Sequence, residues 1–298
     1  MSLVATLIAH PSNPAVTPEL VDRASVGVVV FARDWLAPGI ACDLRLGDGQ
    51  IVDNVRQALA QNLANDPVDI VVQETTGRKK NLLIADMDST MIGEECVDEL
   101  AAEAGVYDHV ADITRRAMNG EIEFESAMSE RVSLLKGLDL GVVDEVLANR
   151  ITLTSGGHAA VATMKANGAY TALVSGGFTL FTGPISRILG FDEHRANILG
   201  HGDGKLDGTV AEPVLGRQAK VDALKELASA RGWSCDQAMA VGDGANDLGM
   251  LHLAGSGVAL HAKPRVAAEA DIRINHGDLT ALLYIQGYRQ SEFVSGDA

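Results

Sequence analysis

The sequence predicts an α/β protein with a parallel sheet, a helical insertion and a separate N-terminal βαββαβ unit. Two observations indicate this fold class: short apolar runs alternate with helical segments after residue 80, and strand-like and helix-like segments alternate before residue 75. Near-continuous apolar runs bounded by helices are typical of parallel strands that are covered on both faces. The chain has 298 residues, which suits two domains of roughly 150 residues each.

The first 75 residues predict a four-stranded antiparallel sheet backed by two helices, a ferredoxin-like arrangement. Thr17 and Pro18 open the first predicted helix, and a turn at Pro38 and Gly39 separates the two middle strands. The polar segment 74–80 reads as a linker to a second domain over residues 76–298. The predicted strands are 4–9, 26–33, 42–46 and 69–73, and the second helix is 51–63.

The second domain is expected to contain a Rossmann-like core with a small helical cap. The segment 94–149 is helical in pattern and too long for a simple crossover, so we expect a cap that extends to about residue 155. Lys205 to Val210 reads as a hairpin turn. The predicted core strands are 81–85, 170–174, 238–241, 257–260 and 271–274.

Composition excludes several classes of function. Forty acidic residues against 24 basic ones give a formal net charge of −16, which disfavours nucleic acid and anionic lipid as partners. The longest dense apolar run, residues 26–32, is far below the ~20 residues that a membrane helix needs. Three scattered cysteines, Cys42, Cys96 and Cys235, suit a reducing cytoplasm better than a disulfide framework. The oligomeric state stays open, with a homodimer as one option.

Acidic side chains follow two of the predicted strands. Asp86 and Asp88 come directly after the first core strand, and Asp243 and Asp247 follow the strand 238–241. Ligands of open α/β sheets bind beyond the carboxyl ends of the strands, so these carboxylates should face one crevice. Asp-x-Asp is also frequent in ordinary turns. Convergence of Asp86 and Asp243 would make a site of hard oxygen ligands, for which Mg²⁺ is the best fit.

Two further motifs are compatible with phosphate binding. Ser175, Gly176 and Gly177 follow the strand 170–174, where backbone N–H groups at a helix N-terminus could bind phosphate, although a plain capping turn explains the motif equally well. Lys220 lies near the start of a predicted helix. By itself it reads as a solvated lysine, and in this context it could place a cation beside a phosphoryl group.

These motifs, in this order, resemble the haloacid dehalogenase superfamily of phosphatases. The series is Asp-x-Asp-Ser-Thr, Ser-Gly-Gly, Lys and Gly-Asp-Gly-x-Asn-Asp. The insertion, with Glu94-Glu95 and the stretch 124–138, resembles the cap of phosphoserine phosphatases, and the resemblance covers about residues 80–290. More loosely, the N-terminal unit is similar to the amino-acid-binding ACT-like domains of some of these enzymes.

The resemblance implies hydrolysis of O-phospho-L-serine to L-serine and phosphate, the last step of serine biosynthesis. Asp86 would be the nucleophile that forms an aspartyl phosphate, and Asp88 the general acid and base. The resemblance further implies Mg²⁺ on Asp86, Asp243 and the backbone carbonyl of Asp88, with Asp247 in or next to the ligand set. The phosphoryl group would be bound by Ser175, Gly176 and Lys220, with support from Asn246.

The resemblance assigns substrate choice to the cap. Glu95 would pair with the ammonium of phosphoserine, Arg131 would bind its carboxylate through a planar fork, and Phe124 would close an apolar wall. Without the resemblance, the two charges read as exposed cap residues and Phe124 as cap core. Two alternatives stay open: a phosphotransferase or phosphatase for a related small phosphomonoester, and a regulatory amino-acid sensor.

Overall fold

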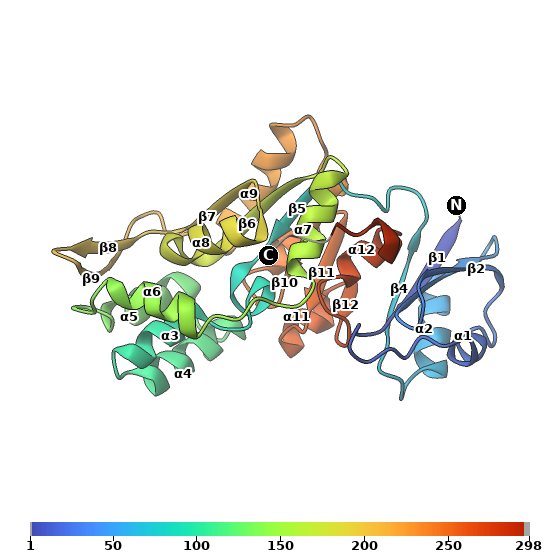
Figure 1. Cartoon of the computed structure of the whole chain (residues 1–298), viewed down its shortest axis with the longest axis horizontal. Coiled ribbons are helices and arrows are strands. Elements are labelled where there is room, and N and C mark those ends of the chain that lie inside the picture. The colour runs from blue at the N-terminus through green and yellow to red at the C-terminus, as the bar shows by residue number, and fades with distance from the viewer. Residues whose placement is uncertain (1, 295–298) are drawn as a thin grey trace.

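The chain folds around two separate sheets and a helical cap, as the computed structural model describes for residues 2–294 (Figure 1). The N-terminal sheet has four antiparallel strands in the order β2-β3-β1-β4. Its elements are β1 (Leu3–Ile8), α1 (Pro18–Ala24), β2 (Val30–Ala37), β3 (Ala41–Leu46), α2 (Val52–Asn62) and β4 (Asp69–Glu74).

Strand β1 is buried on both faces, although an antiparallel sheet often leaves one face in water. Leu3, Ala5 and Leu7 pack in one hydrophobic cluster with α1 and α2. Ile8 belongs instead to the core of the larger sheet. Successive side chains of a strand point to opposite faces, so β1 joins the small sheet to the rest of the molecule.

The larger sheet has six parallel strands in the order β12-β11-β10-β5-β6-β7. This confirms the predicted α/β fold class. All five predicted core strands are present, with ends that differ by a few residues. The strands are β5 (Leu82–Ala85), β6 (Tyr170–Phe178), β7 (Glu193–Asn197), β10 (Ala238–Gly242), β11 (Ser256–Leu260) and β12 (Ile272–Ile274).

Helices cover both faces of this sheet, which explains its apolar strands. Leu83 and Ala85 of β5 face a cluster with one set of helices, and Leu82 and Ile84 face a cluster with the other. The first set is α7 (Gly157–Ala166), α8 (Thr179–Leu189) and α12 (Ala281–Ile285). The second set is α9 (Arg217–Ser229), α10 (Leu248–Leu253) and α11 (Pro264–Glu269). Short helical turns are η2 (Cys235–Gln237) and η3 (Gln290–Glu292).

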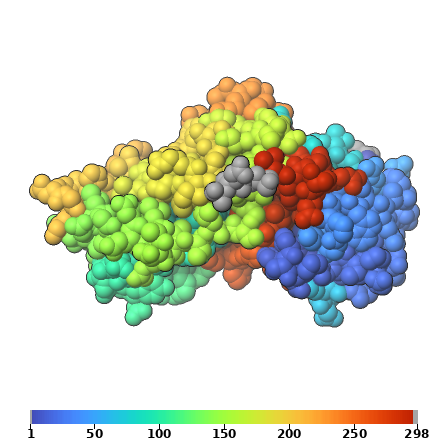
Figure 2. Space-filling model, viewed as in Figure 1, coloured from blue at the N-terminus to red at the C-terminus, as the bar shows by residue number. Residues whose placement is uncertain are grey.

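The insertion between β5 and β6 forms four cap helices over one end of the sheet (Figure 1). They are α3 (Cys96–Glu103), α4 (Tyr107–Met118), α5 (Phe124–Ser133) and α6 (Gly141–Asn149). A two-stranded hairpin from the core, β8 (Leu199–Gly202) and β9 (Lys205–Val210), lies against the cap (Figure 2). The Gly137 N–H donates to Leu206 O at 2.8 Å, and the Leu206 N–H donates to Leu138 O at 2.9 Å. Backbone hydrogen bonds therefore link the hairpin to the segment that follows α5 of the cap.

Outside the site, the structure corrects two expectations of local structure and adds one strand. The second strand begins at Val30, because the chain after α1 turns through Gly27 at φ +75° and leaves Val26 and Val29 about 64–65% exposed. Lys205 to Val210 is a strand of a hairpin whose turn precedes it, with positive φ at Asp203 and Gly204. Strand β7 was missed because its sequence, EHRAN, is polar; it lies at the edge of the sheet.

No helix within residues 2–294 has both the length and the apolar character needed to cross a membrane.

Candidate functional site

The predicted carboxylates meet at one end of the parallel sheet. Strands β5 and β10 are neighbours, with Ala85 opposite Val241, so the residues that follow them emerge side by side. Oxygen atoms of Asp86, Asp243 and Asp247 all lie within 4.8 Å of one another. The three side chains are buried, between 0 and 4% exposed. Acidic groups from distant parts of the chain thus share one small volume.

Two lysines partly balance this negative charge. Lys220 Nζ lies 2.7 Å from both Asp86 Oδ2 and Asp247 Oδ1, and its side chain is fully buried. Lys263 Nζ lies 3.1 Å from Asp243 Oδ2. Lys263 was not among the predicted site residues, because it is 20 residues away from Asp243 and no motif marks it.

The acidic cluster has more carboxylates than nearby cations, and the pKa values reflect this. Burial raises the pKa of Asp86 well above its ordinary value, and the Asp247 carboxylate adds to this while Lys220 opposes it. Burial also raises the pKa of Asp243 to about 6, against the effect of Lys263. Three buried carboxylates with this residual negative charge match the hard oxygen donors that a divalent cation requires.

Asp88 occupies the side of the site that faces the cap. Its Oδ1 accepts a hydrogen bond from the Cys96 backbone N–H at 2.9 Å, and its Oδ2 accepts one from Ser175 Oγ at 3.2 Å. Burial raises the pKa of Asp88, although these hydrogen bonds oppose the shift. The environment therefore favours the protonated carboxyl that a general acid needs. Asp86 and Asp88 belong to one turn, since η1 (Met87–Met91) begins directly after Asp86.

The Ser-Gly-Gly motif lies within an extended strand and not at a helix N-terminus, which corrects our expectation for its local structure. Strand β6 continues to Phe178, and α8 begins at Thr179. Close approach explains the two glycines. A Cβ on Gly176 would lie 2.6 Å from the Phe124 ring, and a Cβ on Gly177 would lie 2.6 Å from Asp88 Oδ2. The motif therefore leaves space for the groups around it.

Asn197 supports the glycine segment and was missed in the sequence. Its side-chain amide donates to Gly176 O at 2.8 Å and to Leu215 O at 3.2 Å, and its Oδ1 accepts from the Leu215 N–H at 2.6 Å. It stands at the end of the polar edge strand β7. A lone asparagine in an unrecognised strand carries no sequence signal.

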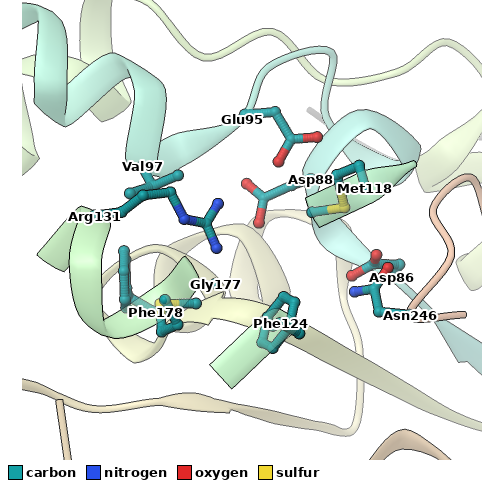
Figure 3. Close-up of a pocket in the computed structure, with 12 residues that line it drawn as sticks. Asp86, Asp88, Glu95, Val97, Met118, Phe124, Arg131, Gly177, Phe178 and Asn246 are labelled. Atoms are coloured by element: carbon teal, nitrogen blue, oxygen red, sulfur yellow. The ribbon is translucent and has the colours of Figure 1, made fainter. Parts of the chain in front are cut away.

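The cap supplies the opposite wall of the site (Figure 3). Arg131 is buried, with 1% of its surface exposed, and its guanidinium points into the cavity near Asp88 and Phe124. Glu95 also lines the cavity, and its Oε1 accepts a hydrogen bond from Ser89 Oγ at 2.7 Å. Burial raises the pKa of Glu95 to about 8, and the carboxylates of Asp88 and Asp243 add to this.

Every predicted substrate residue except Ser175 and Lys220 lines this cavity directly. Those two residues touch it through their contacts with Asp88 and Asp86. Asn246 lines it from the core and is buried. Apolar lining residues that the sequence did not single out are Val97, Met118, Met128 and Phe178. Their apolar side chains resemble those of any packed helix or strand, so composition alone could not identify them.

A model of the haloacid dehalogenase-like hydrolases matches residues 83–252, which is more than half of the chain and includes both acidic strand ends. The chain belongs to this hydrolase family. The match begins within β5 and ends within α10, so it contains the cap and most of the parallel sheet.

Relatives of this hydrolase include phosphoserine phosphatases. The phosphoserine phosphatase of Streptomyces coelicolor is 41% identical over 99% of this chain and 72% of its own length. The probable phosphoserine phosphatase of Schizosaccharomyces pombe is 40% identical over 87% of this chain and 89% of its own.

Solved structures that are similar to this chain also include phosphoserine phosphatases. A phospho-aspartyl intermediate analogue of phosphoserine phosphatase superposes with a TM-score of 0.66 at 42% identity, and the match covers 69% of this chain and 98% of that one. A probable phosphoserine phosphatase from Vibrio cholerae superposes with a TM-score of 0.78 at 31% identity, over 98% of this hydrolase and 88% of that chain.

Proposed function

We infer that this hydrolase is a phosphoserine phosphatase, which converts O-phospho-L-serine to L-serine and phosphate in serine biosynthesis. One observation supports this substrate most directly: a single cavity brings the Arg131 guanidinium and the Glu95 carboxylate opposite Asp86 and Asp88. Phosphoserine carries a carboxylate that Arg131 complements, an ammonium that Glu95 complements, and a phosphate that would face the proposed nucleophile Asp86. The similarity to several phosphoserine phosphatases supports the same conclusion.

We propose that Asp86 attacks phosphorus. An Asp86 oxygen forms a bond to phosphorus while the bond to the seryl oxygen breaks, which gives an aspartyl phosphate and divides one difficult displacement into two. Asp88 gives its proton to the leaving seryl oxygen. Water then attacks phosphorus, Asp88 takes a proton from that water, and Asp86 is released with phosphate. The raised pKa of Asp88 supports this double role.

The phosphoryl oxygens need compensation for their concentrated charge. Ser175 and Lys220 contact Asp88 and Asp86, respectively, so they are placed to bind those oxygens together with the Gly176 N–H. Asn246 lines the same cavity and supports this network.

Hydrolases of this family generally depend on a metal ion. We propose Mg²⁺ as the ion, held by Asp86, Asp243 and the backbone carbonyl of Asp88, with Asp247 beside them. The clustered oxygens of Asp86, Asp243 and Asp247 support this assignment. When bound, the ion shields the Asp86 carboxylate from the negative charge of the substrate.

The substrate cannot enter the cavity in the conformation described. The space in which the centre of a water molecule fits is about 20 Å³, room for one water or so. We therefore propose that the cap moves away to admit phosphoserine and closes again over it, which excludes bulk water from the first displacement.

We propose that residues 1–75 form an ACT-like unit beside a phosphatase unit at 76–298, whose cap spans about 94–155. The antiparallel β2-β3-β1-β4 sheet with two helices is consistent with that unit. Cys42, Cys96 and Cys235 are all free, which agrees with the cytoplasmic location that we propose. A homodimer stays a prediction.

A screen of phosphate release tests the proposed function. Phosphoserine, other phosphorylated amino acids and sugar phosphates are compared with and without Mg²⁺, and alcohol acceptors are added to detect phosphotransfer. We expect phosphoserine with Mg²⁺ to be the preferred substrate, and transfer to an alcohol to be minor. Preference for another phosphomonoester, or dominant transfer, would favour the alternative functions.

The substitution Asp86→Asn tests the nucleophile. The change keeps the shape of the side chain and removes its nucleophilicity, so we expect turnover to fall about 10³-fold or more while the protein stays folded. Phosphate release and thermal unfolding are measured on the same preparation. Normal turnover by this variant would refute the role of Asp86.

A further inference from the structure

Arg131 is held by two of its three guanidinium nitrogens. Its Nε donates to Ala127 O at 3.1 Å, and its Nη1 donates to Thr114 Oγ1 at 3.0 Å. The third nitrogen, Nη2, is buried and has no hydrogen-bond partner among residues 2–294. Because the guanidinium is planar, fixing two nitrogens also fixes the direction of the third. Nη2 is therefore the group that can meet an anion in the cavity.

Thr114 lies on α4 and is 3% exposed. Its hydroxyl oxygen is 3.0 Å from Arg131 Nη1, 2.6 Å from Asp98 Oδ1 and 3.1 Å from Val110 O. A guanidinium can only donate a hydrogen bond, so Thr114 must accept from Arg131. Its single proton is then free for Asp98, the shorter of the two remaining contacts. The hydrogen bonds therefore run from Arg131 through Thr114 to Asp98.

Asp98 connects this series to the rest of the site. It lies in the first turn of α3, two residues after Cys96 and three after Glu95. Cys96 N–H holds Asp88 at 2.9 Å, and Glu95 lines the cavity. One helical turn thus supports Asp88, presents Glu95 and fixes the side chain that orients Arg131. Arg131, Glu95 and Asp88 are thus all positioned by this one turn of α3. They are the groups proposed to meet the substrate's carboxylate, its ammonium and its leaving oxygen.

We propose that Thr114 and Asp98 are positioning residues that direct Arg131 Nη2 into the cavity and so set the preference for phosphomonoesters with a carboxylate. This inference rests on the proposed function. A purely structural role for Thr114 is the competing explanation, because a buried threonine in a helix commonly binds the carbonyl four residues earlier, here Val110. The two explanations differ in whether the loss of the hydroxyl depends on the substrate.

The test compares Thr114→Val with the wild type on two substrates. Phosphoserine has the carboxylate, and phosphoethanolamine keeps the ammonium and phosphate but lacks it. We expect Thr114→Val to raise KM for phosphoserine roughly tenfold and to leave kcat within about twofold, with little effect on phosphoethanolamine. Thr114→Ser keeps the hydroxyl and should restore the wild-type ratio.

Thr163→Val is the matched control. Thr163 is fully buried in α7, and its Oγ1 accepts a hydrogen bond from the Val294 N–H at 2.8 Å, remote from the cavity residues. This variant also loses a buried hydroxyl, and we expect no change in the ratio between the substrates. In an Arg131→Ala background, Thr114→Val should cause no further loss on phosphoserine. Equal loss on both substrates, or an unchanged ratio, would overturn the proposal.

A second measurement separates this proposal from the proposed function. The Nε–H signal of Arg131 can be observed by nitrogen NMR and identified by its disappearance in Arg131→Ala. We expect Thr114→Val to shift this signal and to accelerate its exchange with water, whichever substrate the enzyme uses. An unchanged signal would overturn the positioning role. Failure of the wild type to hydrolyse phosphoserine would instead overturn the proposed function.

Discussion

Arg131 places a guanidinium almost entirely out of water, and burial lowers its pKa despite the carboxylates of Glu95, Asp98 and Asp88 nearby. Burying a charge is costly unless it is paired. Nη2 has no hydrogen-bond partner among the described residues. A ligand carboxylate in the cavity would give the guanidinium an anionic partner. Arg131 therefore favours substrates that carry a carboxylate.

Replacement of Arg131 by alanine should act mainly on substrate binding. We expect KM for phosphoserine to rise about 10- to 100-fold, while a simple aryl phosphate, which has no carboxylate, is nearly unaffected. Steady-state kinetics on both substrates measure this. Arg131→Lys is the control, because lysine keeps the charge without the planar fork. Equal loss on both substrates would contradict a role in recognition.

The segment that leaves the cap is anchored at one glycine. Gly156 has φ +80°, and a Cβ there would lie 2.5 Å from the backbone N of Thr280 and 3.1 Å from Asp278 Cγ. Asp278 Oδ2 also accepts a hydrogen bond from Ser155 Oγ at 2.7 Å. The return from cap to core is therefore tied to the residues that precede α12. A side chain at Gly156 would have to displace the backbone of Thr280 as well as side-chain atoms.

Gly156→Ala should destabilise the protein more than glycine geometry alone explains. Gly168 provides the matched control, since it has φ +85° and a Cβ there meets nothing within 4 Å among the described residues. We expect Gly168→Ala to lower the free energy of unfolding by about 1 kcal/mol, and Gly156→Ala by about 2 kcal/mol more because of the clash. Urea denaturation measures both. Equal losses would show that the contact with Thr280 relaxes without cost.

A buried ion pair helps to join the N-terminal sheet, through segment 74–80, to helix α12. Arg78 Nη1 lies 2.6 Å from Asp43 Oδ2, with side chains 11% and 7% exposed. Arg78 also donates to Thr6 Oγ1 at 3.1 Å and to backbone oxygens of Tyr284 and Ile285. In Figure 2 the red C-terminal segment lies directly against the blue N-terminal lobe. Although the segment 74–80 is polar, Arg78 makes it part of the contact between the two sheets.

Arg78→Ala should weaken this junction strongly. It leaves the Asp43 carboxylate buried without its partner, so we expect a loss of about 3 kcal/mol in the free energy of unfolding. We also expect faster proteolysis of segment 74–80. Arg56→Ala is the control, because the Arg56–Asp53 pair is 40% and 86% exposed and should contribute less than about 0.5 kcal/mol. Similar losses in both variants would contradict a structural role for the junction.

Local patterns were sufficient to predict much of this molecule. The apolar runs identified five of the six parallel strands, because buried strands must be apolar, and the acidic strand ends indicated one crevice. Strand β7 was not predicted, because an edge strand can be polar. The second N-terminal strand was predicted to begin too early, because apolar Val26 and Val29 lie in an exposed turn. Prediction from hydrophobic patterns fails where a strand is polar or where apolar residues lie exposed in a turn.

The sequence by itself determined the fold class, the family motifs and the residue types that could carry phosphate chemistry, since each depends on neighbours along the chain. Only the tertiary structure decided which of these groups touch. The 4.8 Å cluster of carboxylates joins residues up to 161 positions apart. Arg131, whose Nη2 has no partner among the described residues, is linked through Thr114 to Asp98. The carboxylates meet because β5 and β10 are neighbouring strands, and the contacts of Arg131 form because α3, α4 and α5 pack together. No local pattern in the sequence gives these distances.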